Sequence, residues 1–426
     1  MGASYSREDY TSAIISLLNR NWFSRAWVIQ EAALSPNPLI MHSTETFDLR
    51  LLDHLVLAFS KVSRTEGVSL RDLTVLKTTG AATLRHIQTC RQRVLSIVDR
   101  RGKLEFLDIL QRFALSVKAT DPRDHVYAFL AFQDRPLPAL KPDYTLSVEM
   151  AYAAASAAIM NGSGSLSLLG LVRGSLYPYI LPSWAVDWRA AESRQGSRID
   201  QRDGGDFNAS CGRIHKADTP YTVGSPVIGV RGKVIDIIKT TSPICRSKFH
   251  PDPKSCILLF EEFDYIQDIL PEPLSLDSDA RTGFAARILA VLVAYNQGPS
   301  ISNADKELSL NNLLFVYNNL ASLETHEEYQ ENMRYFWDLK NALLHGVALR
   351  IKKRLFFATR YESFGLGPSD IRRGDVVCIL HGSKVPCILR PMGRQYRVVG
   401  QCYYEQWMYG DSVDWQEKNA DTLELI

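Results

Sequence analysis

The spacing of apolar residues changes along this chain, and that change limits the fold more than any other feature of the sequence. In the first part, apolar residues recur at helical spacing, as they do over 49–62 and 148–160. We expect Ser147 to cap the second of these helices and Asn161-Gly162 to end it. Further along, they fall in short runs divided by glycine and proline, which is the pattern of strands and turns. Helices followed by a small antiparallel sheet or barrel make an α+β fold. The predicted strands are 227–238, 354–359, 375–380, 385–389 and 396–404.

The same patterns predict the domain organisation. Residues 1–62 hold the first helices, 63–190 are mainly helical, and 191–220 are a polar loop or linker that contains several glycines. We expect a β-rich region over 221–426, interrupted by a helical insertion at about 255–349. The chain has 426 residues, which is enough for more than one domain.

Composition narrows the possible partners and the compartment. The net charge of +2 gives the chain no strong overall field, so we predict no nucleic-acid partner. Seven cysteines are scattered without a CxxC pair, which favours a reducing compartment, and we predict a cytoplasmic protein. No apolar run is long enough to cross a bilayer. Gly2 followed by Ser6 matches the loose N-myristoylation pattern, which leaves a lipid anchor open.

The common catalytic and metal-binding motifs are missing from the sequence. There is no GxxxxGK[ST] phosphate loop, no GxGxxG that opens a helix after a strand, and no HExxH. Cys245, His250 and Cys256 lie close together, but their spacing matches no common zinc site. We therefore predict no bound metal and no cofactor.

The segment 21–34 predicts an amphipathic helix with a carboxylate among its apolar residues. We expect Glu31 to face a core or a cleft, where an unpaired carboxylate is costly. Two interpretations are open. Glu31 is a structural acid held by an arginine, a tyrosine or backbone N–H groups, which spacing alone favours, or it is a catalytic or ligand-binding acid in a pocket walled by Trp27. The predicted stripe holds Phe23, Ala26, Trp27, Gln30, Glu31 and Leu34.

A second segment places two carboxylates around Arg123. A hydrolase that uses Asp121 or Asp124 is one interpretation. Helix-start chemistry is the simpler one, because Thr120 or Asp121 suits the N-cap and Pro122 suits the first helical position. A carboxylate in the first turn also favours the positive end of the helix dipole. We favour the structural interpretation.

Residues 22–31, with the sequence WFSRAWVIQE, resemble the WF-x-R-x-W-x-x-Q-E signature of fungal heterokaryon-incompatibility (HET) domains. Further blocks typical of proteins with this domain follow in order over nearly the whole chain. They lie at 121–128, 141–144, 181–188, 207–210, 232–236, 365–368, 374–378, 386–390 and 399–403.

This resemblance implies a fold and a site. HET domains are similar to TIR domains, some of which cleave NAD, and the catalytic Glu of TIR domains follows a Trp by four residues. Trp27 and Glu31 have that spacing. The resemblance therefore implies that Glu31 would hold the ribose hydroxyls and stabilise positive charge as nicotinamide leaves, with Trp27 as the pocket wall.

Family members carry a large part of the HET domain before this helix, whereas here Met1 lies a short way upstream. We expect 1–62 to be the C-terminal remnant of a truncated, TIR-like α/β domain, without NAD cleavage in this chain. The leading hypothesis is a HET-domain protein of fungal allorecognition and programmed cell death. The alternatives are a binding or regulatory module that pairs with an intact HET protein, and a TIR-like NAD glycohydrolase whose front half was lost from the gene model.

Overall fold

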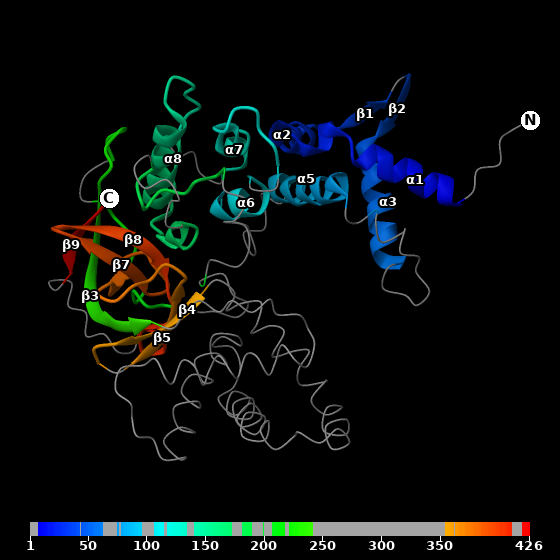
Figure 1. Ribbon diagram of the computed structural model, residues 1–426. Coiled ribbons are helices and arrows are strands. Elements are labelled where there is room, and N and C mark those ends of the chain that lie inside the picture. Colours follow the sequence, from blue (N-terminus) through cyan, green and yellow to red (C-terminus); the bar gives the residue numbers. More distant parts are fainter. Residues whose placement is uncertain are drawn as a thin grey trace, which may run out of the picture. The chain divides into compact units, whose positions relative to one another are not determined.

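The computed structural model describes the chain in fourteen stretches and divides it into two compact units (Figure 1). The first unit is Met1–Ala155 with Asp187–Arg194, and the second is Ser156–Val186 with Gln195–Ile426. The predicted helical insertion at 255–349 and Gly2 lie outside the described residues, and the predicted regional boundaries stay a prediction. The described residues are 7–42, 44–62, 75, 78–95, 106–114, 117–133, 140–172, 181–189, 199, 207–217, 221–241, 354–361, 363–410 and 420–426.

The first unit is built around helix α5 (Thr79–Leu95), which packs against α1 (Arg7–Leu18), α2 (Ala26–Leu34) and α3 (Leu49–Val62). Gly80 lets α1 approach closely, because a Cβ there would lie 2.5 Å from the carbonyl oxygen of Leu18. The other described elements of this unit are η1 (Asn21–Ser24), β1 (Leu39–His42), β2 (Glu45–Asp48), α6 (Phe106–Phe113), α7 (Asp124–Tyr127) and η3 (Leu130–Phe132). Helix α8 (Val148–Ser163) contributes residues to both units.

The predicted helix over 21–34 is interrupted at Arg25. The short 3-10 helix η1 ends at Ser24, and α2 begins at Ala26. Between them, Lys118 donates its N–H to the carbonyl of Ser24 at 2.6 Å and accepts the N–H of Ala26 at 3.0 Å. The backbone at Arg25 is extended because these hydrogen bonds to Lys118, which is distant in sequence, replace one turn of helix.

The second unit contains a mixed sheet of seven strands among the residues described, so the α+β class is confirmed. The strand order is β5-β4-β3-β6-β7-β8-β9, and β3 also pairs with β9. The sheet is not wholly antiparallel, because β8 and β9 run parallel. The strands are β3 (Ile228–Thr241), β4 (Arg354–Thr359), β5 (Phe364–Pro368), β6 (Val376–Leu380), β7 (Cys387–Met392), β8 (Gln395–Gln401) and β9 (Asp421–Leu425); η4 (Ser167–Gly170) and η6 (Glu405–Trp407) accompany them.

The long strand β3 closes the sheet on itself. Its first residues pair with β9 and its last residues pair with β4, while β6 occupies the other edge of the strand. Register shifts at Asp236 and near Ile238 bend β3 between these partners. A further bridge between Leu366 and Tyr403 joins the edge strand β5 to the segment that follows β8. The pairings therefore form closed rings, which protects the edges that an open sheet would expose.

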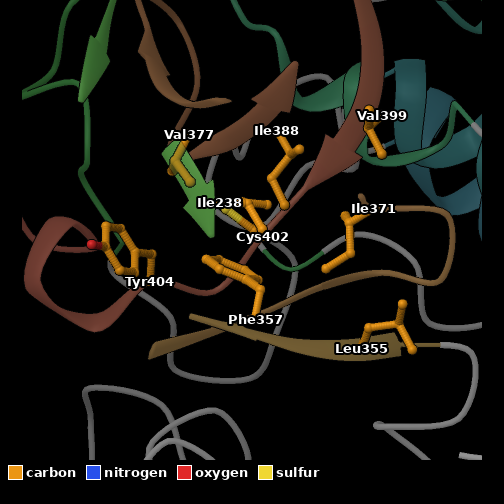
Figure 2. Close-up of a cluster of buried hydrophobic side chains, with 9 residues drawn as sticks. All are labelled: Ile238, Leu355, Phe357, Ile371, Val377, Ile388, Val399, Cys402 and Tyr404. Atoms are coloured by element: carbon orange, nitrogen blue, oxygen red, sulfur yellow. The ribbon is translucent and has the colours of Figure 1, made fainter. Parts of the chain in front are cut away.

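Figure 2 shows the apolar cluster inside this sheet, where side chains from several strands point toward one another. Strand β5 was not predicted, because its glycines and proline suggested a turn. The glycines are required by packing: a Cβ on Gly365 would collide with the ring of Phe357, and one on Gly367 would lie 2.8 Å from Ile388. The cluster consists of Ile238, Leu355, Phe357, Ile371, Val377, Ile388, Val399, Cys402 and Tyr404.

Candidate functional site on helix α2

Helix α2 carries both predicted site residues and is held firmly at its start. The Thr83 hydroxyl on α5 donates a hydrogen bond of 2.6 Å to the carbonyl of Phe23. Phe23 is itself buried, and the bridge to Lys118 follows directly after it. The chain that enters α2 is therefore tied to α5 and to Lys118.

Arg91 of α5 holds the other end of the helix. Its guanidinium donates hydrogen bonds to the carbonyls of Ala32 at 3.0 Å, Ala33 at 3.5 Å and Pro36 at 3.4 Å, and to that of Ser35. The last carbonyls of a helix have no partner within the helix, and a cation there favours the negative end of the dipole. Arg91 thus satisfies several carbonyls at once and fixes where α2 ends.

The buried face of α2 differs from the predicted one, and the expectation that Glu31 faces a core is wrong. Glu31 and Leu34 are exposed, while Trp27 and Gln30 are half-buried. The sequence AWVIQEAAL offers apolar residues on several sides of the helix, so the partner surface selects among them. Small alanines allow close packing against α5, and the buried residues are Ala26, Val28, Ile29, Ala32 and Ala33.

The carboxylate of Glu31 has no hydrogen bond or ion pair to the residues that the structure describes. The main-chain carbonyl of Glu31 accepts the N–H of Ser35 at 3.2 Å, which is an ordinary helix-end bond. A carboxylate stabilises developing positive charge best in a site that excludes water and orients the group beforehand. The described surroundings of Glu31 lack such a site, and the catalytic roles of Glu31 and Trp27 stay predictions.

The second predicted acid site forms a structural clamp. The Asp121 carboxylate accepts three hydrogen bonds from Arg123: the backbone N–H at 3.0 Å, Nε at 2.9 Å and one terminal nitrogen at 2.7 Å. Hydrogen bonding to Arg123 lowers the pKa of Asp121 below its usual value. The other terminal nitrogen of Arg123 donates to the carbonyls of Tyr144 at 2.6 Å and Leu146 at 2.7 Å.

Asp124 is engaged in the same clamp. It accepts the hydroxyl of Tyr144 at 2.6 Å, and the Arg123 guanidinium lies 5.1 Å from the centre of the Tyr144 ring. Burial and the bond to Asp124 raise the pKa of Tyr144 above its usual value. The hydroxyl of Tyr127 donates to the carbonyl of Asp143 at 3.2 Å. The clamp therefore joins 121–128 to 141–146 and gives both acids a structural role. The predicted cap is wrong, however, because α7 begins at Asp124 after Arg123 and has no side-chain cap, so neither Thr120 nor Asp121 is its N-cap and Pro122 is not its first residue. The two segments are separated in sequence, so the contact between them could not be predicted from neighbouring residues.

Buried charges in the sheet are also paired. The buried Asp375 carboxylate accepts Nε of Arg390 at 2.8 Å, a second nitrogen of Arg390 at 2.9 Å and the N–H of Arg372 at 2.8 Å. On β3, the buried Asp236 accepts the hydroxyl of Tyr404 at 2.8 Å. Each acid has a specific partner, which is the usual condition for a buried carboxylate.

The residues that the structure describes form neither a metal-binding cluster nor a membrane-spanning helix. No group of three or more His, Cys, Asp or Glu side chains is arranged to hold a metal ion there. Cys245, His250 and Cys256 fall outside those residues. None of the described helices combines the length and the apolar character needed to cross a membrane. The cysteines that the structure describes are free thiols: Cys90, Cys211, Cys378, Cys387 and Cys402.

Two comparisons with known proteins point to the same group of proteins, which are named for heterokaryon incompatibility. The family described as "Het-6 beta-barrel domain" matches residues 318–423, which include strands β4 to β8. A Neurospora crassa protein named "Heterokaryon incompatibility protein 6, OR allele" is 21% identical over 459 aligned residues, covering 94% of this chain. The chain spans 66% of that protein's length, just under two thirds. No solved structure matches. Both matches support a relationship with heterokaryon incompatibility proteins.

Proposed function

We propose that this chain acts in fungal allorecognition and programmed cell death as a heterokaryon-incompatibility protein, without cleaving NAD itself. The observation that carries the proposal is the Het-6 barrel match over 318–423, together with the similarity that extends through 94% of the chain. Free thiols throughout the described core favour action in the reducing cytoplasm.

A cell-based experiment tests the biological role. The chain is expressed in a filamentous fungus, and the viability of fused cells is scored for like and unlike pairings. We expect viability to fall in some unlike pairings and to recover with Gly365→Val, whose added side chain would collide with Phe357 and disrupt the barrel. Equal viability in every pairing, with the protein present at normal levels, would contradict the role.

The absence of NAD cleavage rests on the exposure of Glu31 and on the lack of described partners around its carboxylate. Purified protein is incubated with NAD, and released nicotinamide is measured by chromatography. We expect no release above the buffer control. Sustained release that disappears in Glu31→Ala but persists in Glu45→Ala, another exposed carboxylate of the same unit, would instead establish a TIR-like NAD glycohydrolase.

A second candidate function is a binding module for an intact HET protein. Helix α2 favours it, because both of its ends are fixed while Glu31 and Leu34 face solvent, and a rigid helix face is a good recognition element. Capture by a full-length HET protein should fall with Glu31→Arg and Leu34→Asp combined, and should persist with Glu45→Arg. Equal capture by both variants would exclude α2 as the contact.

A further inference from the structure

Strands β1 and β2 form a small sheet whose outer edges have no partner among the residues described. The two strands pair antiparallel, with Leu39 opposite Asp48 and Met41 opposite Thr46. Leu39 is 65% exposed and Met41 is 78% exposed, so one face of this sheet presents two large apolar side chains to solvent. A two-stranded hairpin is marginally stable alone in water, and an added strand would stabilise it.

The backbone direction of β1 shows which groups face outward. The carbonyl of Pro38 accepts the N–H of Leu49 at 2.9 Å, so Pro38 points toward the β2 side. In an antiparallel ladder, alternate residues direct both of their backbone groups to the same side. Ile40 therefore faces β2 as well, and Leu39 and Met41 direct their N–H and C=O groups to the free edge.

Charge distinguishes the two edges. Strand β2 carries Glu45 and Asp48, of which Asp48 is paired with Arg50, and charged side chains on an edge strand hinder pairing with another chain. Strand β1 carries no acid, and its residues Leu39, Ile40 and Met41 are all apolar. Pairing two copies through β2 would bring the acids of both copies into one short ladder, whereas β1 contributes no acid.

We propose that β1 is a self-association edge, at which β1 of one chain pairs antiparallel with β1 of a second copy, centred on Ile40. In this register Leu39 lies opposite Met41 of the second copy, and Met41 lies opposite its Leu39. Both are hydrogen-bonded pairs, so all the outward backbone groups of these residues find partners. The ladder contains only these two hydrogen-bonded pairs, because β1 spans no more than Leu39–His42.

The first test removes one outward N–H from each edge. Met41→Pro removes a donor from the β1 edge, and Thr46→Pro removes the equivalent donor from the β2 edge, because Thr46 lies opposite Met41. Proline is tolerated at an edge position whose N–H faces solvent. In sedimentation equilibrium we expect the unmodified chain and Thr46→Pro to dimerise. Met41→Pro should raise the dimer dissociation constant at least ~10-fold. A monomer at every concentration, or equal weakening by both variants, would overturn the proposal.

The second test is independent of how well the proline variants fold. Ile40 would face Ile40 of the second copy as a non-hydrogen-bonded pair, with Cα atoms about 4.5 Å apart, a distance that a disulfide spans. In a background where Cys211, Cys245 and Cys256 are serine, Ile40→Cys should form a covalent dimer under mild oxidation. Thr46→Cys should remain monomeric on a non-reducing gel. Cross-linking by Thr46→Cys alone would contradict the register.

This inference goes beyond the proposed function and does not rest on it. Both tests use purified chain and measure only self-association. A failed cell-death assay would leave the dimer unaffected. Loss of dimerisation in Met41→Pro with unchanged cell death would likewise leave the proposed function in place.

Discussion

At the scale of single residues, one glycine determines how closely two helices pack. Gly80 lies where α5 meets the end of α1, and an added Cβ would sit within 2.9 Å of three Leu18 atoms, two of them backbone. Backbone atoms cannot move aside as a flexible side-chain end can, so the helices would have to separate.

Gly80→Ala should therefore lower the free energy of unfolding by about 1–3 kcal/mol, since overpacking forces a shift in the backbone. Thr79→Ala, at the exposed neighbouring position, is the matched control and should change stability by less than about 0.5 kcal/mol. Urea unfolding followed by circular dichroism measures both. Equal effects of the two substitutions would show that the contact with Leu18 is unimportant.

The environment of His86 predicts that the stability of the fold depends on pH. Burial, with a smaller effect of Arg85, lowers the pKa of His86 from 6.5 to about 4, and its ring stacks on Phe113 with centroids 4.4 Å apart. Between pH 6.5 and 4 the unfolded chain binds a proton that the folded chain does not. Stability is therefore retained above pH 6.5 and lost as the pH falls through this window, by up to about 3 kcal/mol.

His86→Leu should flatten the dependence of unfolding free energy on pH between 6.5 and 4. His54→Leu, at an exposed histidine of α3, is the control, and His86→Leu should flatten the dependence more than this control does. The measurement is chemical denaturation at closely spaced pH values. If the slope in His86→Leu equals that of the unmodified chain, other groups cause the acid sensitivity.

At the scale of elements, α8 shows a helix whose cap was predicted correctly and whose end was not. Ser147 was predicted to cap α8, and its hydroxyl accepts the N–H of Met150 at 3.2 Å. The predicted end at 161–162 was early: α8 runs to Ser163, and the left-handed residue is Gly164 with φ of +67°. A cap is read from neighbouring residues, whereas a helix end also depends on the chain that packs against it.

Removal of Arg91 tests its role at the end of α2. Arg91→Ala should leave the last carbonyls of α2 without their donors and speed amide hydrogen exchange over 26–36 by about tenfold, since a lost helix cap costs about 1 kcal/mol or more. Arg85→Ala is the matched control, because the Arg85 side chain donates a hydrogen bond to Ala81 of its own helix. Exchange that rises equally in both variants would indicate general loosening of α5.

Strands β5 and β9 were missed for different reasons. The sequence of β5, Phe-Gly-Leu-Gly-Pro, lacks the residues that favour strands, and only the close approach of Phe357 and Ile388 makes its glycines necessary. Strand β9 is five residues long with three of them exposed, and its pairing with β3 spans most of the second unit's sequence. Neither contact can be recognised from the residues that neighbour the strand in sequence.

At the scale of the molecule, distant segments are joined by buried polar groups in the sheet. Asp236 of β3 accepts a hydrogen bond from the Tyr404 hydroxyl. The Thr359 hydroxyl at the end of β4 lies 3.2 Å from the Tyr404 hydroxyl oxygen. Burial is the main cause that raises the pKa of Tyr404 to about 12. The hydroxyl therefore stays protonated and donates to the carboxylate at physiological pH.

Tyr404→Phe should lower the stability of the second unit by about 1–3 kcal/mol, because Asp236 loses the donor that satisfies its buried oxygen. Tyr361→Phe removes the same group from an exposed position and should have little effect. Thermal unfolding of both variants provides the comparison. If Tyr404→Phe leaves the stability of the second unit unchanged, water has replaced the lost hydroxyl.

The sequence by itself determined the α+β class, the location of α2 and most strands, and the structural role of Asp121 and Asp124, because these depend on spacing and on neighbouring residues. Only the tertiary structure decided which face of α2 is buried, how β3 closes the sheet, and that Arg91 caps a helix distant in sequence. Several faces of α2 are apolar enough to pack, so the surface of α5 selected the one that leaves Glu31 in solvent. Long-range pairing and packing depend on groups that meet only after folding, and local periodicity does not record them.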